Sequence, residues 1–382
     1  MDIPTSGHRD GRMLGIEMPG GGKPLARLES ILRRALHQHA SDVHLVVGLP
    51  PMFRIDGELI STSDPAFRRD ELKEIVYSSL TPAQREEFEK EWMLCVSLLL
   101  PELGHFRITV YYHMSNVEAS IRVSPLSLRS PDQLGLPAIV QKLVERRSGL
   151  VLITGPTGSG KTTTFNCLID MINRQRRCKI ITVEDPVEYV HENRLSVIIQ
   201  QQVHADTRSF SRALMHILRQ DPDVIGVGEM RDLETISTAL TAAETGHLVI
   251  ATLHTPDAAQ TIDRIVDAFP GDRQSQTLTQ LAASLQAIIA QQLLPRVDRE
   301  GRVLATEVLV ATTGVKAMIR EHKVNQLRSA IQMGARDGMH VMDRALLDLY
   351  QQGVITYDTA MSHAAMPEAI QAAMTPGKDP HI

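Results

Sequence analysis

The sequence predicts an α/β protein of two domains, in which a smaller α+β domain precedes a larger domain with a parallel sheet. A chain of 382 residues suggests two or three domains at roughly 150 residues each. After a proline-rich stretch at residues 125–137, strands and helices alternate. A glycine-rich loop joins the first of these strands to the first of these helices. With 43% apolar and 22% charged residues the composition is globular, which excludes extended disorder for most of the chain.

Charge and cysteine content narrow the class of protein further. Forty Lys and Arg against 45 Asp and Glu leave a net charge of −5, and aromatic residues make up 4%, so we expect no nucleic-acid partner. The three cysteines form no Cys-x-x-Cys pair, which argues against a disulfide framework and a zinc ribbon and favours a reducing, cytoplasmic compartment. No apolar stretch reaches the roughly 20 residues of a membrane helix, so we expect no membrane span.

The first domain is expected over residues 25–124, after a flexible tail at 1–24 that is rich in glycine and proline. Apolar residues at helical spacing predict a helix over 25–36, and the dipeptide Asp56-Gly57 predicts a hairpin turn. Strands and helices are mixed here, which indicates an α+β domain. The other expected elements are strands over 43–47, 52–60, 105–112 and 118–123 and helices over 70–79 and 81–92.

A linker is expected over 125–137, because its three prolines can neither continue a helix nor donate to a sheet. The second domain follows over 138–315, where apolar strands alternate with amphipathic helices, as is typical of a parallel sheet covered on both faces. A helical C-terminal region is expected over 316–382. The predicted strands of this half are 150–154, 179–184, 224–227 and 247–253, and the predicted helices are 161–173, 210–219, 233–243, 316–332, 339–352 and 358–374, the last interrupted by Pro367.

The most specific motif lies between strand 150–154 and helix 161–173. It reads Gly155-Pro156-Thr157-Gly158-Ser159-Gly160-Lys161-Thr162, a complete G-x-x-x-x-G-K-[ST] loop, and Thr163 follows it. In such a loop the backbone amides and the helix N-terminus surround phosphates, the lysine contacts the β- and γ-phosphates, and the threonine hydroxyl holds Mg²⁺. We therefore expect ATP and Mg²⁺ as ligands of residues 155–163, with Lys161 taking part in catalysis.

Two later strands of the second domain end in glutamate. Glu184 ends the strand 179–184, and Glu229 follows the strand 224–227. Because the carboxyl ends of parallel strands share one edge of the sheet with the phosphate loop, both carboxylates can face the phosphates. We assign Glu184 to the attacking water and Glu229 to the metal ion, although the spacing permits the reverse.

Two histidines flank the strand 248–253. His254 follows it at the carboxyl edge, where it can sense the γ-phosphate. His247 precedes it and lies roughly 23 Å away at about 3.3 Å per residue, so the two cannot serve one phosphate in one subunit. His247 is therefore either a residue that begins the strand or part of a contact with another module.

An arginine often spreads the charge of a transferring phosphoryl group, in many cases from another subunit. Arg107 and Arg122 lie on predicted strands of the first domain and are the candidates, the alternative being that they line a solvated strand face. Arg219 and Arg231, near Glu229, are weaker candidates.

These motifs together resemble the secretion ATPases of type IV pili and of type II and IV secretion, in particular the PilT-like pilus retraction (twitching motility) subgroup. The resemblance spans about residues 25–374. The run 319–321, Ile-Arg-Glu, resembles a short motif associated with retraction. The matching runs are 40–45, 48–52, 155–162, 184–189, 227–232, 246–255 and 319–321.

The resemblance implies a PAS-like first domain, a RecA-like ATPase domain and a ring of six chains with ATP bound between the domains. It implies that Arg107 and Arg122 reach the phosphates and that His247 and His254 belong to the nucleotide and domain interface. It also implies a site of action at the pilus base, on the cytoplasmic face of the inner membrane, where the ring acts on a platform protein, with or without a paralogous motor, and returns pilins to the membrane.

Two other functions remain open at this stage. The first is an ATPase for type II or IV secretion or for pilus extension; many such motors carry an extra N-terminal domain and a four-cysteine zinc insert, which this sequence lacks, so retraction is favoured. The second is a scaffold that binds ATP without hydrolysing it and assists another motor. The acidic strand ends and His254 argue against the scaffold.

Overall fold

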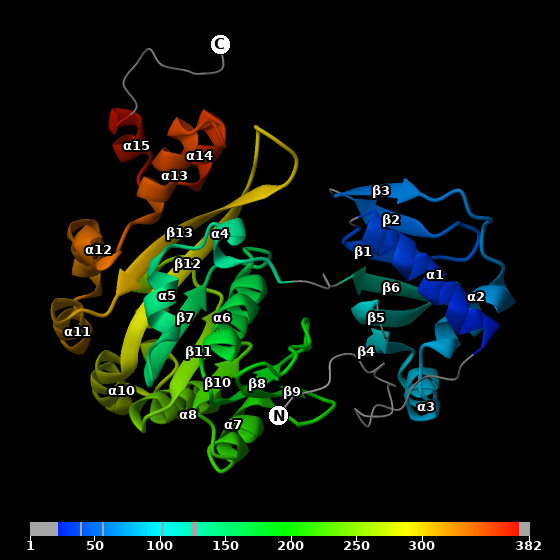
Figure 1. Cartoon of the computed structure of the whole chain (residues 1–382), viewed down its shortest axis with the longest axis horizontal. Coiled ribbons are helices and arrows are strands. Elements are labelled where there is room, and N and C mark those ends of the chain that lie inside the picture. The colour runs from blue at the N-terminus through cyan, green and yellow to red at the C-terminus, as the bar shows by residue number, and fades with distance from the viewer. Residues whose placement is uncertain (1–21, 39, 56, 101–102, 124–127, 374–382) are drawn as a thin grey trace, which may run out of the picture. The chain divides into compact units, whose positions relative to one another are not determined.

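The computed structural model describes residues 22–38, 40–55, 57–100, 103–123 and 128–373. Most of the predicted tail, Asp56 of the predicted hairpin turn, residues 125–127 of the predicted linker and the last nine residues of the C-terminal region lie outside these ranges. Contacts divide the chain into two units, one within residues 1–127 with 188–190 and one comprising 128–187 with 191–382. Each unit has its own sheet (Figure 1).

The first unit is built on a six-stranded antiparallel sheet with the order β3-β2-β1-β6-β5-β4. The run 52–60 forms two paired strands, with Gly57 at φ +92° between them, which confirms the predicted hairpin. The strand β4 was not predicted, because its run of apolar residues lacks the alternation that marks a half-buried strand. The elements are α1 (Lys23–His37), β1 (Asp42–Leu45), β2 (Met52–Ile55), β3 (Glu58–Ser61), α2 (Arg69–Ser78), α3 (Pro82–Glu91), β4 (Met93–Leu100), β5 (Gly104–His113) and β6 (Asn116–Val123).

The helix α1 illustrates how this unit forms its core. Its apolar residues recur at three- and four-residue spacing, and the structure buries that stripe while its charged residues stay exposed or half-buried. The stripe packs with Phe53 and Phe106 of the sheet, which are 1% and 0% exposed. The buried residues of the stripe are Leu25, Leu28, Ile31, Leu32 and Ala35.

The second unit is built on a seven-stranded sheet with the order β13-β12-β7-β11-β10-β8-β9. Neighbouring strands are parallel from β12 to β9, as predicted, and only β13 at one edge is antiparallel to its neighbour. Three strands, β9, β12 and β13, were not predicted, because the glutamines in the first two interrupt the apolar pattern and the last belongs to a hairpin. The strands are β7 (Gly149–Thr154), β8 (Lys179–Glu184), β9 (Val197–Gln202), β10 (Val224–Val227), β11 (Leu248–Leu253), β12 (Leu285–Pro295) and β13 (Arg302–Val310).

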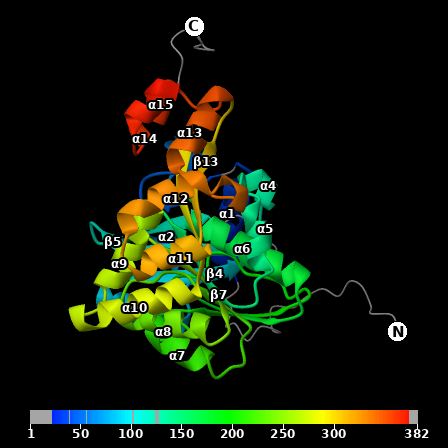
Figure 2. The same ribbon diagram turned by 90° about the vertical axis from the view of Figure 1, so that its left-hand side faces the viewer.

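Helices cover both faces of this sheet. Leu150 and Leu152 of β7 pack in the cluster that includes α7 to α12, whereas Val151 and Ile153, one position on, pack with α5 and α6. The helices α10, α11 and α12 are in the foreground of Figure 2. The helices up to this point are α4 (Pro131–Leu134), which falls within the predicted linker, α5 (Ile139–Val144), α6 (Lys161–Gln175), α7 (Phe210–Ile217), α8 (Leu233–Glu244), α9 (Ala258–Asp267), α10 (Gly271–Ser284), α11 (Thr313–Arg320) and α12 (Leu327–Met333).

The C-terminal region differs from the prediction in one respect. The single helix expected over 316–332 is wrong, because α11 ends at Arg320 and His322 adopts a left-handed φ of +53° before α12 begins. The sequence has no glycine or proline at this break, so the helical spacing of its apolar residues predicts one uninterrupted helix. Beyond it, α13 (Met342–Gln351), α14 (Tyr357–His363) and α15 (Pro367–Ala373) share a small core with β12 and β13.

Candidate active site

The glycine-rich loop connects β7 to α6, as predicted. Gly155, Gly158 and Gly160 have φ values of +144°, +81° and +89°, in the region that residues with a side chain rarely adopt. A Cβ on Gly155 would lie 2.4 Å from the carbonyl oxygen of Gln291 and 2.5 Å from Ser159 Oγ. The loop can therefore curl this tightly only with glycine at these positions.

The loop and the start of α6 present unused hydrogen-bond donors. The helix begins after Gly160 without a side-chain cap, so the positive end of a 15-residue helix faces the loop. Within the part of the chain that the structure describes, the buried hydroxyl of Ser159 has no partner. Donors of this kind at a helix N-terminus match the oxygens of an anionic phosphate chain, so this site fits a nucleotide.

Lys161 lies inside the loop and is only 8% exposed. Its Nζ donates to the carbonyl oxygens of Gly155 at 2.8 Å and Pro156 at 2.9 Å, and it is 3.3 Å from His254 Nδ1. Burial lowers the pKa of the Lys161 ammonium, while the negative charge of Glu229 acts in the opposite direction. The ammonium is thus held at the loop by carbonyl groups that a triphosphate would replace.

Glu229 connects this lysine to two further charged groups. Its Oε1 is 3.1 Å from His254 Nε2, and Arg231 donates to both carboxylate oxygens at 2.7 Å. His254 therefore lies between the two groups, with Nδ1 facing the Lys161 ammonium and Nε2 facing the Glu229 carboxylate. Burial by itself would raise the pKa of Glu229, but the hydrogen bond from Arg231 and the charges of His254 and Arg231 outweigh it and hold this pKa below its usual value.

The structure therefore brings together three of the predicted site residues, Lys161, His254 and Glu229. Arg231, a weaker candidate in the sequence, is the residue that holds the Glu229 carboxylate through two parallel hydrogen bonds. His247 lies at the opposite end of β11, where its Nδ1 is 3.0 Å from the carbonyl oxygen of Ala242. This contact agrees with a residue that begins the strand, and a contact of His247 with another module stays a prediction.

Glu184 is the last residue of β8 and is 2% exposed. Its Oε1 accepts hydrogen bonds from Thr182 Oγ1 at 2.7 Å and Gln200 Nε2 at 3.1 Å. A Cβ on Gly228, the residue before Glu229, would lie 3.1 Å from Glu184 Cα. The two glutamates thus stand at the ends of neighbouring strands, β8 and β10, as predicted. The contribution of Gln200 was missed because its strand was not predicted.

Arg107 and Arg122 belong to the first unit and lie directly opposite each other in the β5–β6 pair. Arg107 Nε is 3.1 Å from Cys95 Sγ, and Arg122 Nε is 3.3 Å from Asp42 Oδ1. Both arginines are exposed. The sheet therefore presents two guanidinium groups on one face, and their role at the phosphates stays a prediction.

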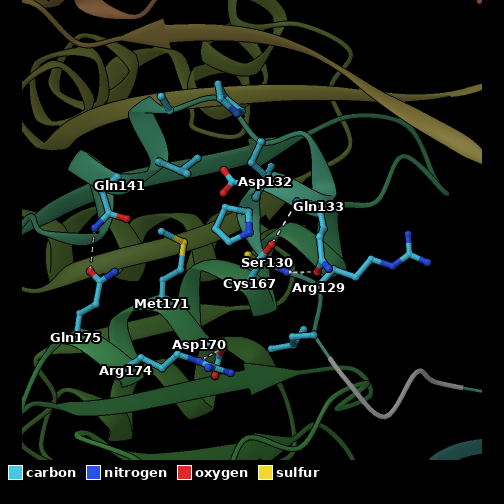
Figure 3. Close-up of a pocket in the computed structure, with 16 residues that line it drawn as sticks. Arg129, Ser130, Asp132, Gln133, Gln141, Cys167, Asp170, Met171, Arg174 and Gln175 are labelled. Carbon is cyan, nitrogen blue, oxygen red and sulfur yellow. Dashed lines mark hydrogen bonds and ion pairs between the residues drawn. The ribbon is translucent and has the colours of Figure 1, made fainter. Parts of the chain in front are cut away.

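A second concave site lies elsewhere in the second unit. This pocket of about 600 Å³ is formed by α4, α5 and α6, and Figure 3 shows its polar side chains. The residues that α6 contributes begin at Cys167 and end at Gln175, so they lie roughly 9–21 Å along the helix from Lys161 at 1.5 Å per residue. Several of its polar groups are already paired, among them Arg174 with Asp170 at 2.6 Å. This pocket is not part of the phosphate loop.

A divalent cation at the loop stays a prediction, and it would be held largely through phosphate and water. Among the described residues, no three His, Cys, Asp or Glu side chains converge on one point. Mg²⁺ at nucleotide sites is bound through one or two side chains together with substrate phosphates. Thr162 and Glu229 are the residues that would hold it, and it would supply charge neutralisation at the phosphate oxygens.

His191 follows the acidic segment after Glu184 and affects how stability depends on pH. It is 8% exposed, its Nε2 is 2.8 Å from Asn166 Oδ1, and burial lowers its pKa to about 4, the charge of Asp170 opposing the shift. Since the unfolded chain binds a proton near pH 6.5, the stability due to neutral His191 is complete above pH 6.5 and is lost as the pH falls towards 4.

We expect His191→Gln to lose less stability on acidification than the wild type. The difference should reach about 2 kcal/mol between pH 7 and pH 5, because only the histidine takes up a proton when the chain unfolds. Urea unfolding of both proteins at the two pH values measures it. Equal losses in the two proteins would show that His191 is protonated in the folded state.

A glycine loop that joins a parallel strand to a helix, a lysine within it and acidic strand ends at the same edge define a P-loop ATPase. Comparisons with known proteins identify the family within this class. The protein family described as "Type II/IV secretion system protein" matches residues 103–375 of this chain. The chain belongs to this family.

Two curated relatives match nearly the whole chain. The type IV pilus retraction ATPase PilT of Pseudomonas aeruginosa is 41% identical over 341 residues, which cover 89% of this chain and 99% of PilT. The twitching motility protein of Neisseria gonorrhoeae is also 41% identical over 341 residues, covering 89% of this chain and 91% of that protein. The predicted resemblance to PilT-like ATPases is confirmed.

Solved structures agree with the fold. The pilus retraction motor PilT with bound ADP has a TM-score of 0.84 and 43% identity over 90% of this chain and 98% of its own. The ATPase DotB of Legionella pneumophila has a TM-score of 0.76 and 27% identity over 93% of this chain and 98% of its own. They confirm the mixed α/β fold and support nucleotide binding. Among the described residues, no helix combines the length and the apolar character needed to cross a bilayer.

Proposed function

We propose that this chain is the ATP-driven motor that retracts a type IV pilus and thereby powers twitching motility. The single observation that carries the proposal is the match to PilT, 41% identical over 99% of that protein's length, in a chain whose own loop and acidic strand ends form an ATPase site. The run Ile319-Arg320-Glu321 supports retraction over extension. It ends α11, with Ile319 buried and the two charged residues exposed.

The proposed chemistry uses residues of the second unit. The amides of the loop and Lys161 bind the phosphates, Thr162 and Glu229 hold Mg²⁺, and His254 is placed to respond to the terminal phosphate through its contacts with Lys161 and Glu229. Glu184 orients or deprotonates the attacking water. Product release then frees Lys161 to return to the carbonyl groups of its own loop.

We further propose that six copies form a ring, with a PAS-like first domain and a RecA-like second domain in each chain. In the assembled ring, Arg107 and Arg122 supply positive charge to the phosphates. The ring acts in the cytoplasm, at the inner face of the membrane at the pilus base, on a platform protein, and drives pilin disassembly. P. aeruginosa has both PilT and PilU, a type IV pilus ATPase that is 36% identical to this chain, which supports a paralogous motor as a partner.

Deleting the gene from the organism that encodes this chain should leave cells with many surface pili that do not retract, and twitching should cease. The reason is that pilus assembly continues while disassembly stops. Electron microscopy counts the pili, and expansion of colonies beneath agar measures twitching. Complementation with the wild-type gene, but not with the Lys161→Ala variant, should restore the phenotype.

The same experiment separates this proposal from the other functions. Loss of all surface pili would identify an extension motor, and normal pili with impaired protein export would identify a secretion ATPase. A scaffold that assists another motor would be supported if Glu184→Gln, which should bind ATP without hydrolysing it, restored twitching as well as the wild type.

A further inference from the structure

We propose that Gln200 is a positioning residue that fixes the Glu184 carboxylate for ATP hydrolysis. The inference rests on the proposed role of Glu184 and extends it to a side chain on the edge strand β9. It concerns how the carboxylate is held before nucleotide binds.

The register of the sheet places Gln200 next to Glu184. In the parallel β8–β9 pair, Gln200 lies opposite Thr182, and Gln202 lies opposite Glu184. Because side chains on the same face of a strand recur every second residue, Thr182 and Glu184 share one face. Thr182 Oγ1 at 2.7 Å and Gln200 Nε2 at 3.1 Å donate to the same oxygen, Glu184 Oε1. Two donors from different strands on one oxygen fix both the position and the rotation of the carboxylate.

A backbone amide sets the direction of the Gln200 side chain. The N–H of His191 donates to Gln200 Oε1 at 2.8 Å. A backbone N–H can only donate, so the carbonyl end of the Gln200 amide must face His191, and its NH₂ end must face Glu184. Gln200 therefore cannot turn its amide over without losing both hydrogen bonds.

The same strand also holds the segment that follows Glu184. Val187 N–H donates to Gln202 Oε1 at 3.2 Å, two residues along β9 from Gln200. The segment from Glu184 to His191 is thus fastened to β9 at both its ends and at Val187. Burial strengthens this arrangement, because Glu184 is 2% exposed and His191 is 8% exposed, so water cannot readily replace the lost partners.

Substitution of Gln200 tests the proposal in the full-length chain. Gln200→Met keeps the length of the side chain but removes both hydrogen bonds, and we expect kcat for ATP to fall roughly 10- to 100-fold while KM and ADP affinity stay within about twofold. Gln201→Met is the matched control, since Gln201 is the next residue of β9 and points to the opposite face. It should hydrolyse ATP at the wild-type rate.

A double-mutant cycle distinguishes positioning from a general loss of structure. If Gln200 acts through Glu184, adding Gln200→Met to Glu184→Gln should lower the residual turnover by less than about twofold. Equal loss in both backgrounds would overturn the proposal, and so would wild-type turnover of Gln200→Met. If instead Glu184→Gln itself hydrolyses ATP normally, the proposed role of Glu184 fails, which is a separate result.

A second variant keeps the test decisive if Gln200→Met does not fold. Gln200→Asn retains an amide but is one methylene shorter, so it cannot reach both His191 N–H and Glu184 Oε1. It should keep a melting temperature close to that of the wild type and still lower kcat at least 10-fold at neutral pH. A normal kcat in this variant would overturn the proposal.

Discussion

Replacing Lys161 with alanine should lower ATP hydrolysis by roughly 10²- to 10³-fold, because the ammonium is the only side-chain cation that the described loop presents to the phosphates. ATP affinity should also weaken, since the same charge contacts the ground state. Phosphate release by the purified full-length chain and equilibrium binding of ATP measure the two effects.

Lys142→Ala is the matched control for this experiment. Lys142 is an exposed lysine near the end of α5 in the same unit, and removing it should leave turnover at the wild-type level. Lys161→Ala should not unfold the chain, because the glycines of the loop set its conformation, and a melting temperature close to that of the wild type checks this. Turnover above one-tenth of the wild-type value with an intact fold would contradict the assignment of the loop as the site of hydrolysis.

Replacing Glu184 with glutamine should lower turnover by roughly 10²- to 10⁴-fold while ATP still binds, because an amide cannot accept a proton from water. The variant should therefore retain unhydrolysed ATP, which rapid filtration and quantification of the bound nucleotide can show. Glu192→Gln is the control, since Glu192 is exposed on the same segment beyond Glu184. Rapid hydrolysis by Glu184→Gln would remove this residue from the chemical step.

Glu229→Gln tells the two glutamates apart. If Glu229 holds Mg²⁺, this variant should need a higher Mg²⁺ concentration for half-maximal turnover, whereas Glu184→Gln should not. The opposite pattern would exchange the two roles. Arg231 donates to both oxygens of Glu229. Arg231→Gln should therefore lower turnover without raising the Mg²⁺ concentration needed for half-maximal turnover.

Much of the second unit could be predicted because its signals are local. The strands β7, β8, β10 and β11 are short apolar runs, and each was expected close to its observed bounds. The loop 155–162 carries its own conformational requirement in three glycines. Parallel topology then predicted that Glu184 and Glu229 lie at the same edge of the sheet, and the structure adds that their strands are neighbours.

Other features escaped prediction because they depend on partners distant in the sequence. The second half of β9 is polar in sequence. Its glutamines form hydrogen bonds with Glu184 and with the segment that follows Glu184. The hairpin of β12 and β13 extends the sheet by a pairing that the strand-helix pattern does not contain. The break at His322 has no glycine or proline to mark it.

The amino-acid sequence alone was sufficient to determine the phosphate loop, the four parallel strands β7, β8, β10 and β11 and the presence of acids at the strand ends, because these depend on short-range chemistry and on spacing. Only the tertiary structure decided which side chains meet there: His254 between Lys161 and Glu229, Arg231 on Glu229, and Gln200 on Glu184. The physical reason is that a hydrogen bond depends on ångström distances and on the direction of a donor. Both are set by the packing of strands that lie far apart in the chain.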